Sequence, residues 1–509
     1  MKKFLTLLLA LAMMLTLVAC GGNSEPAAEG GEDAATGVKE ELVIGTDENV
    51  TTLDPQGSNS RPNEQLYYLT HNNLVKDDGA GNIVPDLAES YEKTGDLEWT
   101  FHLRQGVKFH NGEELKAGDV AFTLTRALDS SFTADYVEHI EKTEAVGDYD
   151  VVITLKDDCQ DILFFLRNKT LSILNEKAVT EDPDNGPIVG TGPFVLREWE
   201  LNDHTTVDRF EDYFGELPQT KTITFRIIPE AAARIISLQT GEIDVCEYPA
   251  AIDLPTVTGN PDLQLLQVAG DTMNYVTFNT TRAPFDNADV RHAVAYAIDR
   301  AKVIEVAEEG NASPAYTFFS PGYAMTEDVE HYDYDPAKAT ELLASAGYTE
   351  ANPLKITMVC SGDTKLLQAQ VIQQCLKEVG VEMAIESLEL TALKDLFKAA
   401  DYDISLYNWA NESLGPDTNC RPILGSGSGS NRSHFADAHF DELIDKGIIE
   451  PDDAARQAIY AEAQQYAIEQ LPIMPLYYQN VYVPATAKLQ GFTPNASECH
   501  DFSMAYVVE

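Results

Sequence analysis

The strongest constraint on the fold comes from the second half of the chain, where strand-like and helix-like segments alternate. Five segments make up this pattern: apolar strands at 354–360, 381–387 and 402–408, and helical stretches at 365–379 and 390–399. Parallel strands need a crossover connection, and a helix is the usual one, so this spacing predicts a parallel sheet covered by helices. The first half is richer in strand-like segments. We therefore expect an α/β protein with a β-rich first half.

Capping residues mark the ends of further helices. Asp335-Pro336 supplies an N-cap followed by proline at the first helical position, and Gly347 ends that helix. Gly241 ends another helix, which begins near residue 231. Residues 273–278 then read as a strand in the middle of the chain.

Alternating apolar and polar residues in the first half predict a hairpin. Residues 99–103 alternate between the two types, and the alternation resumes at residues 107–109 after Gln105-Gly106. A period of two places the apolar side chains on one face of a strand, and a turn between two such runs lets them pair. We therefore expect residues 99–103 to pair with residues 107–109.

The charge balance of the chain is strongly acidic. The sequence has 35 Lys and Arg residues against 83 Asp and Glu residues, a formal net charge of −48. A polyanion of this kind repels phosphate backbones, so no nucleic-acid partner is expected. Apolar residues make up 44% of the chain and charged residues 23%, which is typical of soluble globular proteins and excludes a largely disordered chain.

The first twenty residues predict export and a lipid anchor. Lys2 and Lys3 precede an apolar stretch at residues 4–18, which is too short for a membrane span of about 20 residues. The stretch ends in Leu-Val-Ala followed by Cys20, which resembles a bacterial lipobox. That resemblance implies that residues 1–19 are a lipoprotein signal peptide and that Cys20 is lipidated; the alternative is an ordinary signal peptide with a chance cysteine. No later segment has eighteen consecutive apolar residues, so lipid would be the only attachment to the membrane.

A polar segment and six scattered cysteines follow the signal. Residues 20–39 are rich in Gly, Ala, Glu and Ser and have almost nothing to bury, so they predict a flexible tether. The later cysteines form no Cys-x-x-Cys pair: Cys159, Cys246, Cys360, Cys375, Cys420 and Cys499. Export permits disulfides, but spacing alone predicts no pairing. We expect mostly buried free thiols.

Motifs for catalysis or metal binding are missing from the sequence. We find no phosphate loop, HExxH, EF-hand loop or nucleophile elbow. Residues 90–93 match SxxK and residues 93–95 match KTG, but the two motifs share Lys93, whereas penicillin-binding enzymes place them on distant elements. His434 and His439 are five residues apart, which is not zinc spacing on one helix face. We therefore expect no enzymatic activity, no metal and no cofactor.

Motifs spread along the chain resemble those of one known family. Residues 85–91 lead into residues 99–112 and then 119–123, and this order resembles the signature of the bacterial extracellular solute-binding proteins of family 5. That family is the peptide/nickel group that serves ABC importers. Further matching motifs lie at residues 52–55, 190–194, 238–244, 278–280, 290–300 and 335–348. The resemblance covers essentially the whole chain after the signal peptide.

The resemblance implies a two-lobed clamp of the type II periplasmic-binding-protein fold. Lobe one would comprise residues 40–271 and 476–509 and would include an extra subdomain at about 84–185. Lobe two would comprise residues 272–475. The cargo would bind between the lobes, and the clamp would close by hinge motion on the two strands that cross between them.

The resemblance also implies which segments line the cleft. In peptide binders of the family the segment after residues 52–55 lines it, which corresponds to Asn59, Ser60 and Arg61. The end of a strand whose backbone pairs with the peptide corresponds to Asn408, Trp409 and Ala410. These six positions are expected ligand-binding residues.

Charged contacts to the ends of a peptide follow from the same resemblance. An acid three residues after the tryptophan holds the α-ammonium in peptide binders, which corresponds to Glu412, with Asp417 as the substitute. Dipeptide-type members place an arginine after the strand at 354–360 to hold the carboxylate. This chain has residues 361–365 there, with no arginine, so the resemblance does not supply that contact.

The sequence thus predicts a solute-binding lipoprotein on the outer face of the cell membrane. It would act as a monomer, attached by lipid alone, and deliver a small solute, with a peptide as the favoured cargo, to an ABC transporter permease. Two alternatives stay open. The same fold could bind a metal chelate, an oligosaccharide or another amine, or the chain could be a structural or adhesive surface lipoprotein, although the repeats usual in adhesins are missing.

Overall fold

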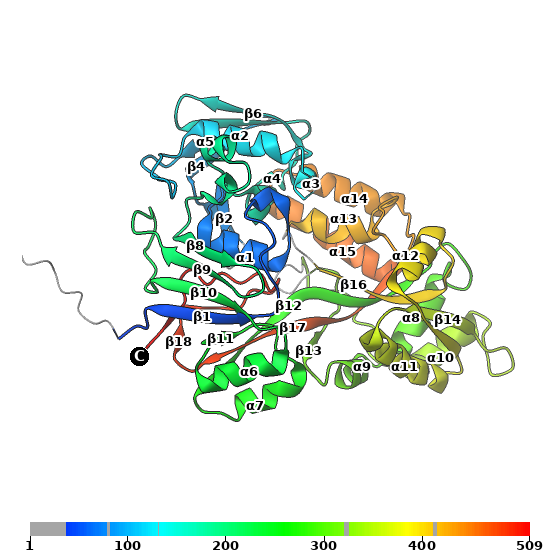
Figure 1. Cartoon of the computed structure of the whole chain (residues 1–509). Coiled ribbons are helices and arrows are strands. Elements are labelled where there is room, and N and C mark those ends of the chain that lie inside the picture. The colour runs from blue at the N-terminus through cyan, green and yellow to red at the C-terminus, as the bar shows by residue number, and fades with distance from the viewer. Residues whose placement is uncertain (1–36, 79–81, 131, 320–324, 411–414) are drawn as a thin grey trace, which may run out of the picture. The chain divides into compact units, whose positions relative to one another are not determined.

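Two long antiparallel strands, β12 (Leu263–Phe278) and β17 (Ile473–Thr486), hold the fold together (Figure 1). They lie next to each other in an eleven-stranded mixed sheet with the order β15-β14-β16-β12-β17-β11-β1-β10-β9-β8, while β13 pairs with β17 off this path. The computed structural model describes residues 37–78, 82–130, 132–319, 325–410 and 415–509. The predicted signal peptide, Cys20 and nearly all of the tether therefore lie outside the described residues.

The other strands and the helices have the following bounds. The strands are β1 (Glu41–Thr46), β2 (Val75–Asp77), β3 (Ile83–Pro85), β4 (Ala88–Gly95), β5 (Glu98–Leu103), β6 (Ile140–Val146), β7 (Asp150–Leu155), β8 (Phe194–Glu200), β9 (His204–Arg209), β10 (Thr222–Ile227), β11 (Val245–Cys246), β13 (Ala312–Pro314), β14 (Lys355–Cys360), β15 (Glu382–Ser387), β16 (Ile404–Trp409), β18 (Leu489–Gln490) and β19 (Tyr506–Val507). The α-helices are α1 (Arg61–Thr70), α2 (Ala117–Ala127), α3 (Ala134–Val137), α4 (Ile162–Leu166), α5 (Glu176–Glu181), α6 (Ala231–Thr240), α7 (Leu254–Thr258), α8 (Ala288–Ala297), α9 (Arg300–Ala307), α10 (Pro336–Ser345), α11 (Asp363–Glu378), α12 (Leu390–Ala399), α13 (Pro416–Leu424), α14 (Ala438–Ile449) and α15 (Asp453–Gln470). Four short 3₁₀ helices complete the set: η1 (Pro55–Gly57), η2 (Lys169–Leu171), η3 (Gly186–Ile188) and η4 (Ala251–Asp253).

The strand and helix alternation of the second half folds as the sequence predicts. Strands β14, β15 and β16 are parallel, and α11 and α12 connect them. Strand β16 then pairs antiparallel with β12, so the parallel strands form one end of the mixed sheet. The predicted caps are also confirmed: Asp335 accepts hydrogen bonds from the N–H groups of Ala337 and Lys338 at the start of α10.

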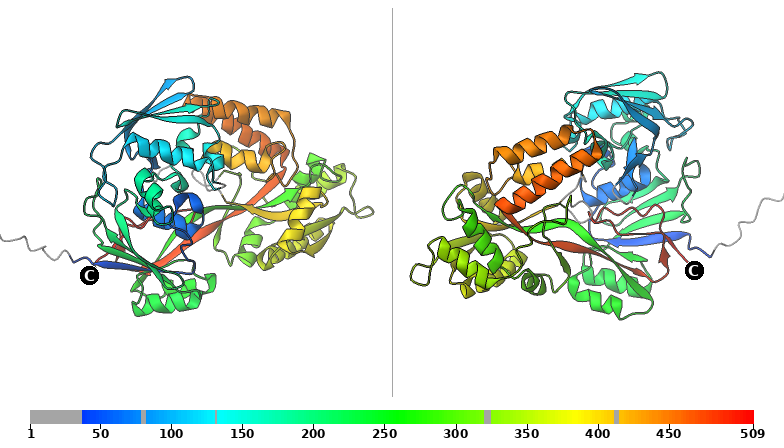
Figure 2. Two further views of the ribbon diagram at one scale, coloured as in Figure 1. Left: turned by 45° about the horizontal axis from the view of Figure 1, so that its top comes forward. Right: turned by 180° about the vertical axis from the view of Figure 1, so that it is seen from behind.

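The other end of the sheet has different helices on its two faces (Figure 2). Leu42 and Ile44 of β1 pack in a core that includes Leu66 of α1. Val43 points to the opposite face and packs with Ile235 of α6. Because successive side chains of a strand point to opposite faces, α1 and α6 cover opposite sides of β1. This arrangement brings the start of α1 and the segment after β11 to the same edge of the crossing strands.

The predicted hairpin at residues 99–109 is wrong. Strand β5 pairs with β4 on one side and with β7 on the other, in a separate four-stranded sheet with the order β4-β5-β7-β6. Strands β4 and β7 thus occupy both edges of β5, so residues 107–109 have no free edge of β5 to pair with. Val107 and Phe109 are instead buried in the core of this sheet, which spans residues 74–173. A core of its own favours the predicted subdomain at about 84–185.

A buried ion pair links this four-stranded region to the helices of the second half. Asp161, at the start of α4, is fully buried, and its carboxylate accepts a hydrogen bond from Arg456 of α15 at 3.2 Å. The N–H of Gln160 donates to the carbonyl of Ile448 in α14 at 2.9 Å, and Ile448 packs against the four-stranded core. Burial raises the pKa of Asp161 to about 6. Figure 1 shows α4 beside α14.

Candidate functional site

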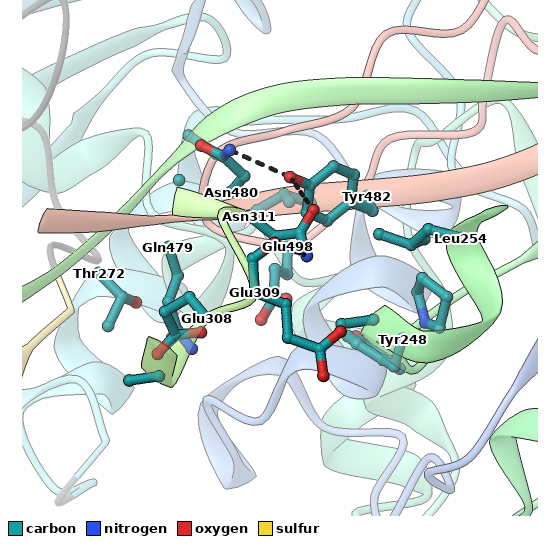
Figure 3. Close-up of a pocket in the computed structure, with 16 residues that line it drawn as sticks. Tyr248, Leu254, Thr272, Glu308, Glu309, Asn311, Gln479, Asn480, Tyr482 and Glu498 are labelled. Carbon is teal, nitrogen blue, oxygen red and sulfur yellow. Dashed lines mark hydrogen bonds between the residues drawn. The ribbon is translucent and has the colours of Figure 1, made fainter. Parts of the chain in front are cut away.

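A pocket of about 340 Å³ lies beside the crossing strands (Figure 3). Five separate segments line it: 248–254, 270–272, 307–311, 479–482 and 496–498. The pocket is therefore built where segments from both halves of the chain meet β12 and β17. A hydrogen-bond chain crosses its wall, because Asn480 donates to the Tyr482 hydroxyl at 3.1 Å and that hydroxyl donates to Asn311 at 3.3 Å.

The first residue of α1 reaches the edge of this pocket. The Arg61 guanidinium donates to the carboxylate of Glu498 and lies 5.0 Å from the centre of the Tyr248 ring. Glu498 and Tyr248 both line the pocket. Of the predicted segment at residues 59–61, Arg61 thus makes the contacts to the pocket wall. Asn59 is exposed, and the Ser60 hydroxyl donates to Asn63 at 2.9 Å.

The predicted strand end lies on β16, next to β12. Asn408 is exposed and pairs in register with Asn274, while Trp409 pairs with Met273. Ala410 is exposed at the end of the strand. The indole N–H of Trp409 is buried, and no acceptor lies within reach of it in the part of the chain that the structure describes. A buried donor without a partner is a candidate contact for a ligand carbonyl.

Of the two predicted acids, Asp417 lies next to the buried ion pair of Asp161 and Arg456. Its side chain is 5% exposed, and its carboxylate accepts a hydrogen bond from Arg421 at 2.7 Å. Burial raises its pKa. The second acid, Glu412, lies outside the described residues.

Lys365 ends the segment at residues 361–365, which lacks the arginine that dipeptide-type members carry. The sequence alone did not predict Lys365 as a binding residue. Its ammonium, on α11, donates to the side chain of Asn274 at 3.2 Å. Burial lowers its pKa to about 8, while the charge of Glu308 opposes that shift. Within the described ranges, no carboxylate lies at ion-pair distance from this ammonium. In a chain with 83 acidic residues, a partly buried cation without such a partner can accept an anionic group from a ligand.

Arg234 holds the loop that carries Tyr248. Its side chain is 1% exposed, and its guanidinium donates to the carbonyls of Glu247 at 3.0 Å and Tyr248 at 2.7 Å. The same group donates to the carbonyls of Ile228 and Pro229 at the start of α6. One buried cation therefore ties the loop that carries Tyr248, a residue of the pocket lining, to the backbone just before α6.

Three residues that line the pocket have left-handed backbone conformations. The φ angle is +48° at Tyr248, +52° at Glu309 and +63° at Glu498. Side chains other than glycine rarely adopt these values, and the conformation costs on the order of 1–3 kcal/mol where it is enforced. Strain of this kind is concentrated at binding sites and favours the pocket as the functional site.

The described residues around the pocket provide side chains that can bind a ligand. The described residues as a whole contain no group of three or more His, Cys, Asp or Glu side chains that could hold a metal ion. Their six cysteines are buried and free, as the sequence predicts. Over the same residues, no helix is long and apolar enough to cross a bilayer. The pocket region instead combines a cation, carboxylates, amides and aromatic rings, which suits noncovalent binding of a polar solute.

The fold is a two-lobed clamp of the periplasmic-binding-protein type, with an α/β architecture joined through the crossing strands. Residues 82–431 match the family described as bacterial extracellular solute-binding proteins, family 5 Middle. The chain belongs to this family. It is therefore a solute-binding component of an ABC transport system that acts outside the cytoplasm, and it is not an enzyme.

Similar proteins share most of the chain. Heme-binding protein A of Haemophilus influenzae is 29% identical over 86% of this chain and 86% of that protein. Di/tripeptide-binding protein 2 of Pseudomonas aeruginosa is 28% identical over 84% of this chain and 86% of that protein. The solved structure of HbpA2 from Haemophilus parasuis has a TM-score of 0.85 at 24% identity and covers 92% of this chain and 99% of its own.

Proposed function

We propose that this protein binds a short peptide with a free carboxylate and delivers it to an ABC importer. The observation that carries the proposal is Lys365, a partly buried cation without an anionic partner among the described residues. A peptide carboxylate supplies that partner. The buried indole N–H of Trp409 and the exposed strand end at Asn408 offer hydrogen bonds for the peptide backbone.

The relatives favour this cargo class over the alternatives. Di/tripeptide-binding protein 2 is named for such a ligand. Heme-binding protein A is named for heme. The pocket lining has no histidine, cysteine or methionine, and the side chains there of a type that ligates haem iron are two tyrosines, Tyr248 and Tyr482. A metal chelate, an oligosaccharide or another amine would leave Lys365 without a carboxylate unless the ligand carries one.

The first prediction tests the cargo and its carboxylate contact. Trialanine should bind the protein, and its C-terminal amide should bind about 30-fold more weakly, because removal of one charge of a desolvated pair costs roughly 2 kcal/mol. The substitution Lys365→Met should weaken trialanine binding by a similar factor and change amide binding little. Titration calorimetry on the four combinations measures this.

A matched control separates the contact from general charge effects. Lys355 pairs with Glu382 and is 69% exposed, so Lys355→Met should leave trialanine binding unchanged within twofold. Equal binding of trialanine and its amide by the wild type would overturn the role of Lys365. Failure of trialanine to bind at all would overturn the short-peptide cargo.

We also infer that the protein is attached to the membrane through lipid on Cys20. The Leu-Val-Ala-Cys run after the apolar stretch supports this. The second prediction is that Cys20→Ala releases the protein into the medium or periplasm, or leaves the precursor uncut. Membrane fractionation and the mass of the N-terminal peptide measure it, and unchanged attachment and processing would contradict it.

The lobe boundaries and the monomeric state belong to the same proposal. Lobe one would comprise residues 40–271 and 476–509, and lobe two residues 272–475. The pairing of β12 with β17 supports a hinge there, because these two strands carry the chain between the two ends of the sheet.

A further inference from the structure

A second partly buried cation in the second half of the chain has no carboxylate partner. Arg432 lies between α13 and α14, and the Cζ atom of its guanidinium is 5.5 Å from the centre of the Phe397 ring and 5.4 Å from that of Tyr407. Its Nη1 atom donates to the carbonyl of Gly429 at 2.7 Å. Within the part of the chain that the structure describes, its buried Nε finds no acceptor, and no carboxylate lies at ion-pair distance from the guanidinium.

The aromatic side chains beside Arg432 carry further hydrogen-bond donors. Tyr407 and Trp409 are two residues apart in β16 and therefore point to the same face of the sheet. Tyr275 of β12 pairs in register with Tyr407, and the two ring centres are 6.4 Å apart. We refer to Tyr275, Tyr407, Trp409 and Arg432 as the donor face. All of its members except Tyr275 are partly exposed, so a ligand can reach it.

The donors of the donor face lack acceptors. The indole N–H of Trp409 is buried without a partner among the described residues. Tyr275 is 1% exposed, and its hydroxyl makes no hydrogen bond to them. Burial raises the pKa of Tyr275, and the nearby charge of Arg432 opposes that shift. Buried donors without acceptors are rare because each costs the desolvation of a polar group, so the arrangement indicates that a ligand supplies the acceptor.

The missing acceptor has the chemistry of a carboxylate. Aromatic rings hold the Arg432 guanidinium in place by cation–π contact but do not neutralise its charge. The planar fork of a guanidinium matches the two oxygens of a carboxylate. In a chain with 83 acidic residues against 35 basic ones, a cation left without a carboxylate is unusual. The donor face therefore fits an anionic group that comes from outside the chain.

We propose that the donor face is an anion subsite of the binding site and that Arg432 receives the acidic side chain of a peptide cargo. The cargo would then be a short peptide that contains aspartate or glutamate. This identification of the cargo rests on the proposed function, whereas the affinity of the donor face for a carboxylate does not.

The strand geometry lets one peptide reach Arg432 and Lys365 together. Lys365 binds Asn274, and Asn274 points to the opposite face from the donor face, because its neighbour in β12 belongs to that face. Strand β14 pairs with β16 only at Ile404 and Ser405, so it leaves the edge at the end of β16 uncovered. An extended peptide along this edge would direct successive groups to the two faces. Its carboxylate and an acidic side chain can thus meet different cations.

The experiment compares glutamate with glutamine in the cargo. Each residue of trialanine is replaced in turn by glutamate or by glutamine, and titration calorimetry measures the six affinities. At least one glutamate tripeptide should bind the wild type about 30-fold more tightly than its glutamine counterpart. General repulsion by the acidic chain acts in the opposite direction, so such a preference requires a local cation.

Variants of Arg432 assign the preference. Arg432→Met should reduce it to about twofold or less and change the affinity for the glutamine tripeptide little, while Arg432→Lys should keep part of it. Arg282 supplies the matched control, because it is 44% exposed and pairs with Asp401, so Arg282→Met should keep the wild-type preference. A preference that persists in Arg432→Met would overturn the proposal. Equal losses for both tripeptides would also overturn it, because they indicate a merely structural role.

Acetate tests the donor face without a peptide. The chain has three tryptophans, so the variant Trp409→Phe identifies the indole N–H signal of Trp409 in a nitrogen–proton NMR spectrum. Replacement of chloride by acetate at constant ionic strength should shift this signal saturably in the wild type and leave it unchanged in Arg432→Met, whereas acetamide should leave it unchanged in both. Absence of the acetate shift in the wild type overturns the proposal. If acetate shifts the signal while no tripeptide binds, the short-peptide cargo fails and the anion subsite stands.

Discussion

The variant Arg234→Met should unfold with a free energy about 4 kcal/mol below that of the wild type, because it removes four hydrogen bonds that a buried guanidinium donates to backbone carbonyls. The Arg234 side chain is 1% exposed. Its guanidinium serves four carbonyls, those of Ile228, Pro229, Glu247 and Tyr248. Methionine fills most of the volume but donates no hydrogen bond, so all four carbonyls lose a partner, and the contact to the carbonyl of Glu247 is lost in a buried site. Urea denaturation followed by circular dichroism measures the difference.

An exposed arginine on the neighbouring strand supplies the control for this variant. Arg226 is 46% exposed and pairs with Glu242, so Arg226→Met should change the free energy of unfolding by less than about 1 kcal/mol. Arg234→Met should also weaken trialanine binding, since the loop with Tyr248 loses its anchor. A loss of stability no larger than that of Arg226→Met would show that the guanidinium does not hold this loop.

The variant Arg456→Met should lose about 3–5 kcal/mol of stability at pH 8, because it leaves the buried Asp161 carboxylate without its cation. Asp161 is fully buried and Arg456 is 15% exposed. Burial raises the pKa of Asp161 in the folded protein to about 6, from an ordinary value of 3.8. A raised carboxyl pKa means that stability falls as pH rises from about 4 through 6, and Arg456 opposes that fall by stabilising the ionised form.

The pH dependence of this loss distinguishes the ion pair from simple packing. At pH 5 Asp161 is largely protonated, so Arg456→Met should cost clearly less there than at pH 8. Addition of Asp161→Asn to Arg456→Met should recover part of the stability at pH 8. Lys446→Met, which removes an exposed partner of Glu442, serves as the control with little expected effect. An equal loss at both pH values would contradict the ion-pair account.

Local patterns predicted the regular parts of the fold well. The strands and helices from β14 to β16 follow from apolar periodicity, and Asp335 follows from capping chemistry, because both signals act within a few residues along the chain. The hairpin at residues 99–109 failed because pairing partners compete over long distances. Strand β7 lies some fifty residues away, yet it takes the edge that the local pattern assigned to residues 107–109.

The candidate site was predicted only in part, because it also depends on contacts between residues that are far apart in the chain. The resemblance placed Arg61 near the cleft, and the structure joins it to Tyr248 and Glu498. Lys365 carried no signal beyond its charge, because the property that marks it, burial without a carboxylate partner, exists only after folding. Arg432 likewise reads as one of 35 basic residues in the sequence.

The sequence by itself determined the α/β class, the family, the acidic surface and the expectation of an exported lipoprotein, because composition, periodicity and ordered motifs act locally or additively. Only the tertiary structure decided which polar groups meet. The pairing of β12 with β17 brings together segments that are up to about 250 residues apart, and burial then raises the pKa of Glu247 and lowers that of Lys365. Desolvation depends on every neighbour in space, so no local pattern along the chain encodes it.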